Sequence, residues 1–207
     1  MSEARPTSRR GATPFHVVAA GITARLNAIL PVAQDITLEA VNAKALIVRT
    51  GDAVRAFRPI TDYMDELAQD TIRLVRAINQ EATLVLRATM EEMRLGVLVR
   101  ALRRALDAYD GPNAVTVGAR LAQIEDRRQK LENERRSRRH ALDMLITEID
   151  ARMKAARIIA GTSRIEAAGA GPYQGSVGSV ADTLERAAKA IQARIDECRR
   201  MLRRADY

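Results

Sequence analysis

Apolar residues recur every three to four positions along most of the chain, which is the period of an amphipathic helix. After Pro59 the apolar positions are spaced alternately by four and three residues, as in a coiled coil. They are Ile60, Met64, Leu67, Thr71, Leu74 and Ile78. A similar heptad pattern runs from Val117 to Ile159, although Arg128, Arg135 and Arg138 occupy seam positions in it. The pattern predicts long helices that pack side by side.

Proline and glycine indicate where these helices start, bend and stop. Residues 1–12 are rich in Ser, Arg and Gly and are expected to form a disordered tail. Thr13 followed by Pro14 is typical of a helix start, and Pro31 predicts a kink because it removes a hydrogen bond in mid-helix. Pro59 indicates the start of a second helix.

Three breaks in the pattern predict three chain reversals. They lie at Thr50-Gly51, at Asp110-Gly111-Pro112-Asn113, and over the glycine-rich residues 169–178. Ser179 with Asp182 three residues later is interpreted as the capping box of the last helix. Residues 13–110 are therefore expected to form a helical hairpin with its tip near 49–57, and residues 111–207 a second hairpin with its tip near 169–178.

The two hairpins show signs of an internal repeat. Gly51 and Gly171 are 120 residues apart, and Gly111 lies midway between them. A shift of 120 aligns similar residues, namely Ala40 with Ala160, Lys44 with Arg164, Ile60 with Val180, Asp62 with Asp182, Met64 with Leu184 and Asp65 with Glu185. The predicted fold is all-α, an elongated antiparallel four-helix bundle or coiled coil that forms a single-chain pseudo-dimer. Residues 84–109 and 113–138 are expected to extend from it as a thinner two-helix stem.

The composition agrees with this fold and limits the functions that the chain can have. The chain is 47% hydrophobic and 29% charged with only 3% aromatic residues, a balance typical of helices packed through aliphatic seams. A formal charge of +8 permits nucleic acid, anionic lipid or an acidic protein as partner, without selecting one. The single Cys198 excludes an intrachain disulfide. Arginine interrupts the longest apolar runs, so we expect no membrane span of roughly 20 apolar residues and a cytoplasmic protein.

Two segments carry a recognisable pattern of residues at the expected hairpin tips. Residues 40–68 contain Asn42, Arg49, Gly51, Asp52, Arg55, Phe57, Asp62, Leu67 and Ala68. Residues 160–182 contain Ile165-Glu166-Ala167-Ala168, Ala170-Gly171 and Val180-Ala181-Asp182. Aligned without gaps, both segments resemble the conserved signalling-tip hairpin of methyl-accepting chemotaxis proteins, the bacterial chemoreceptors. Leu46 stands where that family has a glutamate, and Gly169 where it has an arginine.

The resemblance implies a function in signalling. In the family, hairpins from two subunits form a four-helix bundle whose tip binds a histidine kinase and a coupling protein. By resemblance, this chain is a soluble signalling or adaptor protein that binds those chemotaxis components or modulates receptor arrays. The implied partner-binding residues are Asn42, Arg49, Asp52, Arg55, Phe57, Glu166, Tyr173 and Gln174.

Two other functions stay open. His140, with Asp143 one turn away, is a candidate phospho-accepting histidine on a helical bundle; the alternative is a solvated helix residue. The arginines between Arg127 and Arg139 are candidates for contacting nucleic-acid phosphates. Because Glu125, Asp126, Glu132 and Glu134 alternate with them, the same run also reads as a solvated helical surface.

Catalysis is not expected from this sequence. The glycines of residues 169–178 lack the Lys-Ser/Thr ending of a P-loop, and no nucleophile and base pair emerges. His16 and His140 are isolated from each other and from Cys198, so no metal-ligand spacing is present. We therefore expect no enzyme activity, no cofactor and no metal.

Overall fold

The computed structural model describes residues 15–50, 57–108 and 111–204. Within these ranges the chain is helical and contains no strand, which confirms the predicted all-α class. The α-helices are α1 (Phe15–Asn27), α2 (Ile29–Thr50), α3 (Arg58–Asp107), α4 (Ala114–Ala167) and α5 (Gln174–Arg204), with a 3-10 turn η2 (Gly171–Tyr173) before α5. The expected tail 1–12 and the Thr13-Pro14 helix start lie outside the described residues.

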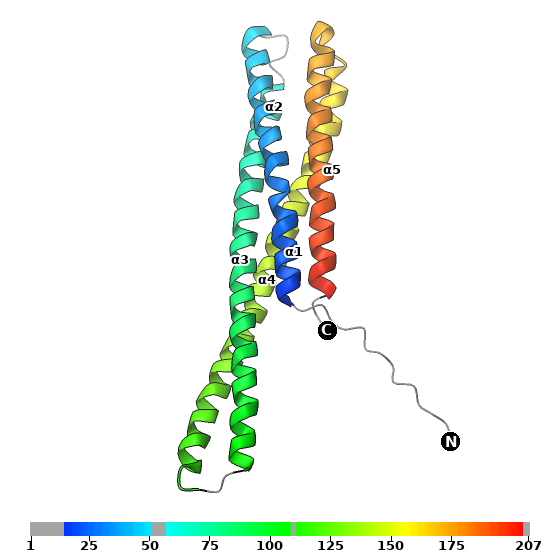
Figure 1. Ribbon diagram of the computed structural model, residues 1–207. Helices are drawn as coiled ribbons and strands as arrows, with labels where there is room; N and C mark the ends of the chain where they lie inside the picture. The colour runs from blue at the N-terminus through cyan, green and yellow to red at the C-terminus, as the bar shows by residue number, and fades with distance from the viewer. Residues whose placement is uncertain (1–14, 51–56, 109–110, 205–207) are drawn as a thin grey trace, which may run out of the picture.

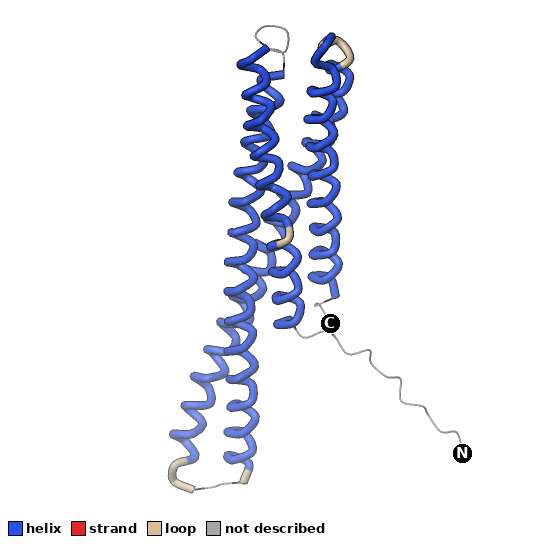
Figure 2. The backbone as a smooth tube through the Cα atoms, turned by 45° about the horizontal axis from the view of Figure 1, so that its top comes forward, coloured by secondary structure: helices blue, strands red, loops and turns tan. Residues whose placement is uncertain are grey.

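The helices lie lengthwise in one rod (Figures 1 and 2). The junctions from α2 to α3 and from α4 to α5 are at one end of the rod, and the turn from α3 to α4 is at the other. The α1–α2 segment and α4 each pack against both α3 and α5. Because α1 begins and α5 ends partway along the rod, one half contains all these helices and the other only α3 and α4. We call these the bundle half and the stem, the stem comprising residues 84–107 and 114–138.

Proline determines two of the helix boundaries. α1 ends at Asn27, one turn before Pro31, because the proline ring excludes the carbonyl four residues earlier from the helix. Pro59 occupies the first turn of α3, where its missing N–H group costs no hydrogen bond. Pro59 lies at the helix start as predicted, whereas near Pro31 the structure has a break between two helices in place of the predicted kink within one.

The expected loop over 169–178 is too long. The chain reverses between Ala167 and Gln174, with Gly171 in the left-handed region at φ 55°, and α5 already includes Gly175 and Gly178. Val177 and Val180 are buried in this first part of α5, and their packing outweighs the roughly 1 kcal/mol helix penalty of each glycine. Ser179 and Asp182 therefore lie inside the helix and form no capping box.

The core follows the predicted seams through the bundle half. The largest fully buried side chains come from every long helix, and they are Ile22, Leu26, Ile29, Ile36, Met64, Leu67, Ile78, Leu142, Ile146, Ile149, Met153 and Leu184. The seam of α3 from Met64 to Ile78 is buried as expected. The last helix contributes Val180, Leu184, Ala187, Ile191 and Ile195, also as expected.

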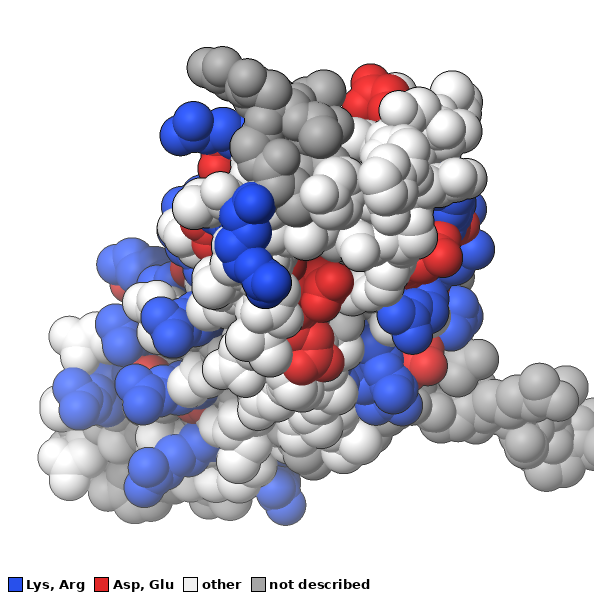
Figure 3. All heavy atoms as spheres, turned by 90° about the horizontal axis from the view of Figure 1, so that it is seen from above, with Lys and Arg blue, Asp and Glu red and all other residues white. Residues whose placement is uncertain are grey.

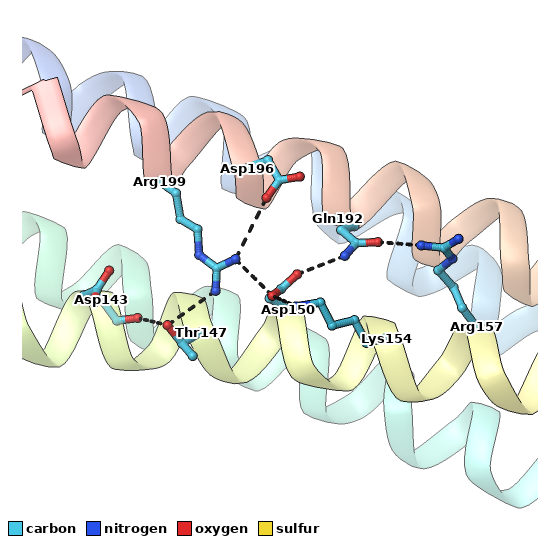
Figure 4. Close-up of polar contacts among 8 residues, drawn as sticks. All are labelled: Asp143, Thr147, Asp150, Lys154, Arg157, Gln192, Asp196 and Arg199. Carbon is cyan, nitrogen blue, oxygen red and sulfur yellow. Dashed lines mark hydrogen bonds and ion pairs between the residues drawn. The ribbon is translucent and has the colours of Figure 1, made fainter.

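A buried carboxylate joins α4 to α5 (Figure 4). Asp150 is 4% exposed and accepts hydrogen bonds from Gln192 at 3.1 Å and Arg199 at 2.9 Å, while Lys154 lies at 2.8 Å. Burial alone would raise its pKa, but the hydrogen bonds from Lys154, Arg199 and Gln192 outweigh burial and lower the pKa of Asp150 below its usual value. Ionised Asp150 thus ties the two helices together.

Ion pairs hold α3 and α4 together along the stem and at its junction with the bundle half. Acidic residues of α3 meet arginines of α4, with Glu81 at 3.4 Å from Arg138, Glu91 at 3.1 Å from Arg127 and Glu92 at 3.0 Å from Arg135. Arg135 and Arg138 are half-buried at the seam, as their heptad positions predict. Arg128, expected in the same seam, is instead exposed, because a contact between only two helices leaves its edges open to water.

One helical stretch of the described chain has the length and apolar composition of a membrane span. It is Val17–Arg49, which runs through the break between α1 and α2, and 33% of its most apolar window is buried in the rod. The expectation that no stretch is sufficiently apolar is therefore wrong by this criterion. Core helices of soluble proteins and N-terminal signal sequences satisfy the same criterion.

Candidate interaction surface at the end of the bundle

The two hairpins meet at the end of the bundle half through a small apolar cluster. Phe57, which precedes α3, packs with Ala167 and Ala170 at the end of α4 and with Val177 of α5. Ile47, Ile60 and Tyr173 pack around them. Phe57 is only 7% exposed. It therefore supports the bundle end from inside and is not available for the direct partner contact that the sequence analysis expected.

The other expected partner-binding residues are divided between the two hairpins. Asn42 and Arg49 are exposed on α2, Glu166 is exposed near the end of α4, and Gln174 is exposed at the start of α5. Tyr173 is half-buried beside the apolar cluster. The structure thus brings Phe57 and Tyr173 together, whereas the exposed residues lie on the outside of their helices. Asp52 and Arg55 lie outside the described residues.

Each hairpin carries a matching ion-pair cluster near this end. Lys44 of α2 lies 3.1 Å from Asp62 and 3.3 Å from Asp65 of α3. At positions 120 residues later, Arg164 of α4 lies 2.7 Å from Asp182 of α5 and also pairs with Glu185. The hydrogen bond to Asp62, with a further one to Asp65, raises the pKa of Lys44. Hydrogen bonds from Lys189 and Arg164 lower the pKa of Glu185 to about 2.

Exposed aliphatic side chains form a stripe on the outside of each hairpin. Leu38, Val41 and Val48 are exposed on α2, and Ile158 and Ile165 on α4. Leu38 and Ile158, 120 residues apart, are 62% and 71% exposed. Figure 3 looks down on this end, where uncharged side chains occupy much of the surface. Exposed apolar side chains gathered on one side of a helix are common in protein-binding surfaces.

Sequence reasoning missed these stripes because it followed the apolar positions of the buried seam. Leu38, Val41 and Val48 are spaced by three and seven residues, out of phase with the buried Ile36, Ala40 and Ala43 of the same helix. A second helical phase of apolar residues was the signal that could have identified them.

A shallow hollow of about 880 Å³ lies along α4 and α5 at this end and is lined mainly by polar and charged residues, among them Arg164, Gln174, Asp182 and Glu185. The apolar cavity between Ile47, Phe57, Ile60 and Val180 has a volume of about 20 Å³, whereas ligand pockets usually exceed roughly 300 Å³. Among the residues described, no group of three or more His, Cys, Asp and Glu side chains is arranged to hold a metal.

His140 lies away from this end, where the stem meets the bundle half. It is exposed on α4 beside a hollow between α4 and the end of α5. Asp143 also lines this hollow, together with Arg135, Arg136, Arg139, Arg199 and Arg203.

Comparisons of the chain with protein-family models, curated proteins and solved structures find no match. Function is therefore inferred from the residues and their arrangement.

Proposed function

We propose that this chain is a non-enzymatic signalling adaptor whose bundle end binds partner proteins through two related surfaces, one on each hairpin. The observation that carries the proposal is the pair of exposed aliphatic stripes at corresponding positions, Leu38 on α2 and Ile158 on α4. Removing exposed aliphatic side chains of this size from water lowers the free energy. A partner protein is the occupant that such a surface fits.

The two surfaces are related because the chain is proposed to be a pseudo-dimer of hairpins. Burial at sites 120 residues apart supports this relation. Each member of the following pairs is buried: Ile22 and Leu142, Ile29 and Ile149, Ile36 and Ala156, Ala40 and Ala160, Met64 and Leu184, Ala68 and Ala188, and Ile78 and Cys198. The matching ion-pair clusters of Lys44 and Arg164 support it independently, since they do not depend on apolar patterning.

The proposed partners follow from the resemblance of both hairpin ends to the chemoreceptor tip. They are a chemotaxis histidine kinase, its coupling protein, or other chemoreceptors in an array. Asn42 and Arg49 on one hairpin and Glu166 on the other supply polar groups close in sequence to the stripes. Such groups contribute specificity around an apolar contact.

The test measures binding of purified coupling protein and kinase to the immobilised full-length chain. Leu38→Ser with Val41→Ser alters the first surface, and Ile158→Ser with Ile165→Ser alters the second; all four side chains are exposed, so the fold is preserved. Each pair is expected to weaken binding about tenfold, and the four together to abolish it. Val115→Ser with Met144→Ser, exposed apolar positions outside both stripes, is the matched control. Unchanged binding by the fourfold variant would contradict the proposal.

A second candidate function is histidine phosphotransfer through His140. The observation that favours it is the exposed position of His140 beside an arginine-lined hollow, where cationic side chains would stabilise a phosphoryl group. Incubation with an autophosphorylated histidine kinase is expected to label the wild type and not His140→Ala. Equal labelling of the two proteins would contradict this candidate.

A further inference from the structure

Helix α3 carries a second seam that faces away from the stem contact with α4. Its positions follow heptad spacing from Asn79 to Arg104, and they are Asn79, Thr83, Leu86, Met90, Met93, Val97, Arg100 and Arg104. The seam that packs in the rod is a different set, which includes Ile78, Ala82, Val85 and Val99. Two seams on one helix indicate that α3 has more than one helical neighbour along its length.

In the bundle half, the α1–α2 segment lies along one side of this second seam, while Arg76 and Thr83 of the same spacing are exposed. Asn79 donates a hydrogen bond from Nδ2 to Oδ1 of Asn27 in α1 at 2.9 Å. Asp65, two heptads earlier in the same phase, pairs with Lys44 of α2. The second seam is thus partly covered by α1 and α2 in the bundle half.

The same seam continues into the stem and is open to solvent there. Met90, Met93 and Val97 are 53%, 55% and 59% exposed. They line a shallow groove along the stem together with Leu95 and Arg128. A helix placed there would continue along the side of α3 that α1 and α2 partly cover in the bundle half.

Unpaired positive charge borders this open seam. Arg94, Arg100 and Arg128 line the groove, and within the described ranges none of them forms an ion pair. Arg127, Arg135 and Arg138, by contrast, each pair with a carboxylate of α3. The stem as a whole carries 12 basic and 7 acidic residues. Glu91 and Glu92 also line the groove, but each pairs with an arginine of α4, so the groove combines apolar side chains with three unpaired arginines.

We propose that this groove of the stem binds an acidic amphipathic helix of a partner protein. Apolar side chains of that helix would pack on Met90, Met93 and Val97, and its carboxylates would pair with Arg94, Arg100 and Arg128. The bound helix extends the packing of α1 and α2 on α3 and turns the two-helix stem into a three-helix bundle. The groove is distant from the bundle end, so this proposal stands apart from the adaptor function proposed above (Figure 1).

Charge and composition argue against other occupants. A second copy would bring its own cationic stem to this one, with repulsion between like charges. Residues 1–14 of this chain carry three arginines and one glutamate, and after Met1 they contain no large apolar side chain. Nucleic acid would pair with the arginines but would gain little from Met90, Met93 and Val97, and the groove lining includes no aromatic side chain for base stacking.

The test uses the full-length chain and two designed fluorescent peptides of 21 residues. One is helical with leucine at heptad positions a and d and glutamate at e and g; the other is identical but has lysine in place of glutamate. The acidic peptide is expected to bind with a Kd on the order of 10 μM by fluorescence anisotropy, and the basic peptide at least tenfold more weakly. Binding of the acidic peptide is also expected to weaken as salt is added.

Variants locate the binding site. Met93→Ser with Val97→Ser is expected to weaken acidic-peptide binding at least tenfold. Arg94→Glu, Arg100→Glu and Arg128→Glu together are expected to reverse the preference toward the basic peptide. The matched control, Arg76→Glu with Arg157→Glu and Arg186→Glu, makes the same change in net charge on exposed residues of the bundle half and should leave the preference unchanged.

Three results would overturn the proposal. The first is no binding of the acidic peptide at roughly 100 μM. The second is equal weakening by the stem and control variants, which would show that net charge alone attracts the peptide. The third is binding of duplex DNA or anionic phosphatidylserine vesicles, lost in the stem variants, without binding of the acidic peptide; this would reassign the groove to a polyanion or a lipid surface.

Discussion

At the scale of single residues, buried carboxylates specify how these helices pair. Aliphatic seams of Leu, Ile and Ala permit two helices to slide past each other by one heptad at little cost in buried area. Asp150 removes that freedom between α4 and α5, because its hydrogen bonds to Gln192 and Arg199 form in only one register. Asp70, buried on α3 and paired with Arg152 of α4, has the same role for the neighbouring helix pair.

Replacement of Asp150 by alanine is expected to lower the free energy of unfolding by about 3 kcal/mol, because Arg199 then loses its buried partner. Chemical denaturation monitored by circular dichroism measures the change. Asp143→Ala, at an exposed position on the same helix, is the control and should change stability by less than about 0.5 kcal/mol. Similar losses in both variants would show that the Asp150 network does not hold the register.

Glu185 gives the chain a predictable acid sensitivity. Its pKa is lowered to about 2 in the folded protein from the usual 4.5, so the folded state favours the ionised form. The stabilisation is complete above pH 4.5 and is lost as pH falls from there toward 2. The difference in Tm between wild type and Glu185→Gln should therefore be constant above about pH 5 and disappear near pH 2.

Thermal melts over this pH range test the expectation. Glu39→Gln, which removes a carboxylate that forms no ion pair among the described residues, is the control for the loss of a negative charge. A Glu185→Gln difference that stays constant down to pH 2 would show that the pairs with Arg164 and Lys189 are absent in solution.

At the scale of secondary-structure elements, the break between α1 and α2 is a local consequence of Pro31. The buried residues Ile22, Leu26, Ile29, Ala33 and Ile36 keep heptad spacing across the break, so the two helices remain in one seam. Pro31 itself is exposed and contributes no core packing. The proline therefore interrupts the hydrogen bonding of a segment that could otherwise run as one helix.

Pro31→Ala is expected to raise the free energy of unfolding by about 1–3 kcal/mol, since it restores a backbone hydrogen bond and a better helix former. Pro59→Ala is the matched control, because Pro59 occupies the first turn of α3, where proline is tolerated. Its stability should change by less than about 0.5 kcal/mol. A loss of stability in Pro31→Ala would show that the bend between α1 and α2 is required for packing.

Much of the helical organisation could be predicted because a heptad of aliphatic residues specifies both the helix and its buried face. The seam from Met64 to Ile78 and the helix start at Pro59 are examples. The start of α5 could not be predicted, since Gly175 and Gly178 signal a loop and only the packing of Val177 and Val180 keeps them helical. The exposed stripes could not be predicted from the sequence either. An apolar residue such as Leu38 is identified as a surface residue only when its neighbours in space are known.

At the scale of the whole molecule, the two halves of the rod differ in how much of each helix is buried. In the bundle half every long helix has two neighbours, whereas in the stem α3 and α4 have only each other (Figure 1). Fewer buried apolar contacts lower the free energy of local opening. The rod is therefore expected to open first at the stem.

Native-state hydrogen exchange measures this difference. Amides of residues 84–107 and 114–138 are expected to exchange faster than those at the core of the bundle half, such as residues 64–78. The acidic helical peptide should slow exchange in the stem and leave residues 64–78 unchanged. Uniform protection along α3 in the free protein would contradict the expected order of opening.

The positions of the first and last helices also determine how this rod can be joined to anything else. α1 begins and α5 ends near the middle of the rod. A domain fused to either of these helices would therefore be attached to the side of the rod and not to one of its ends. Both extremities would then stay free to engage different molecules at the same time. Such a fused domain would be held between the molecules bound at the two ends of the rod.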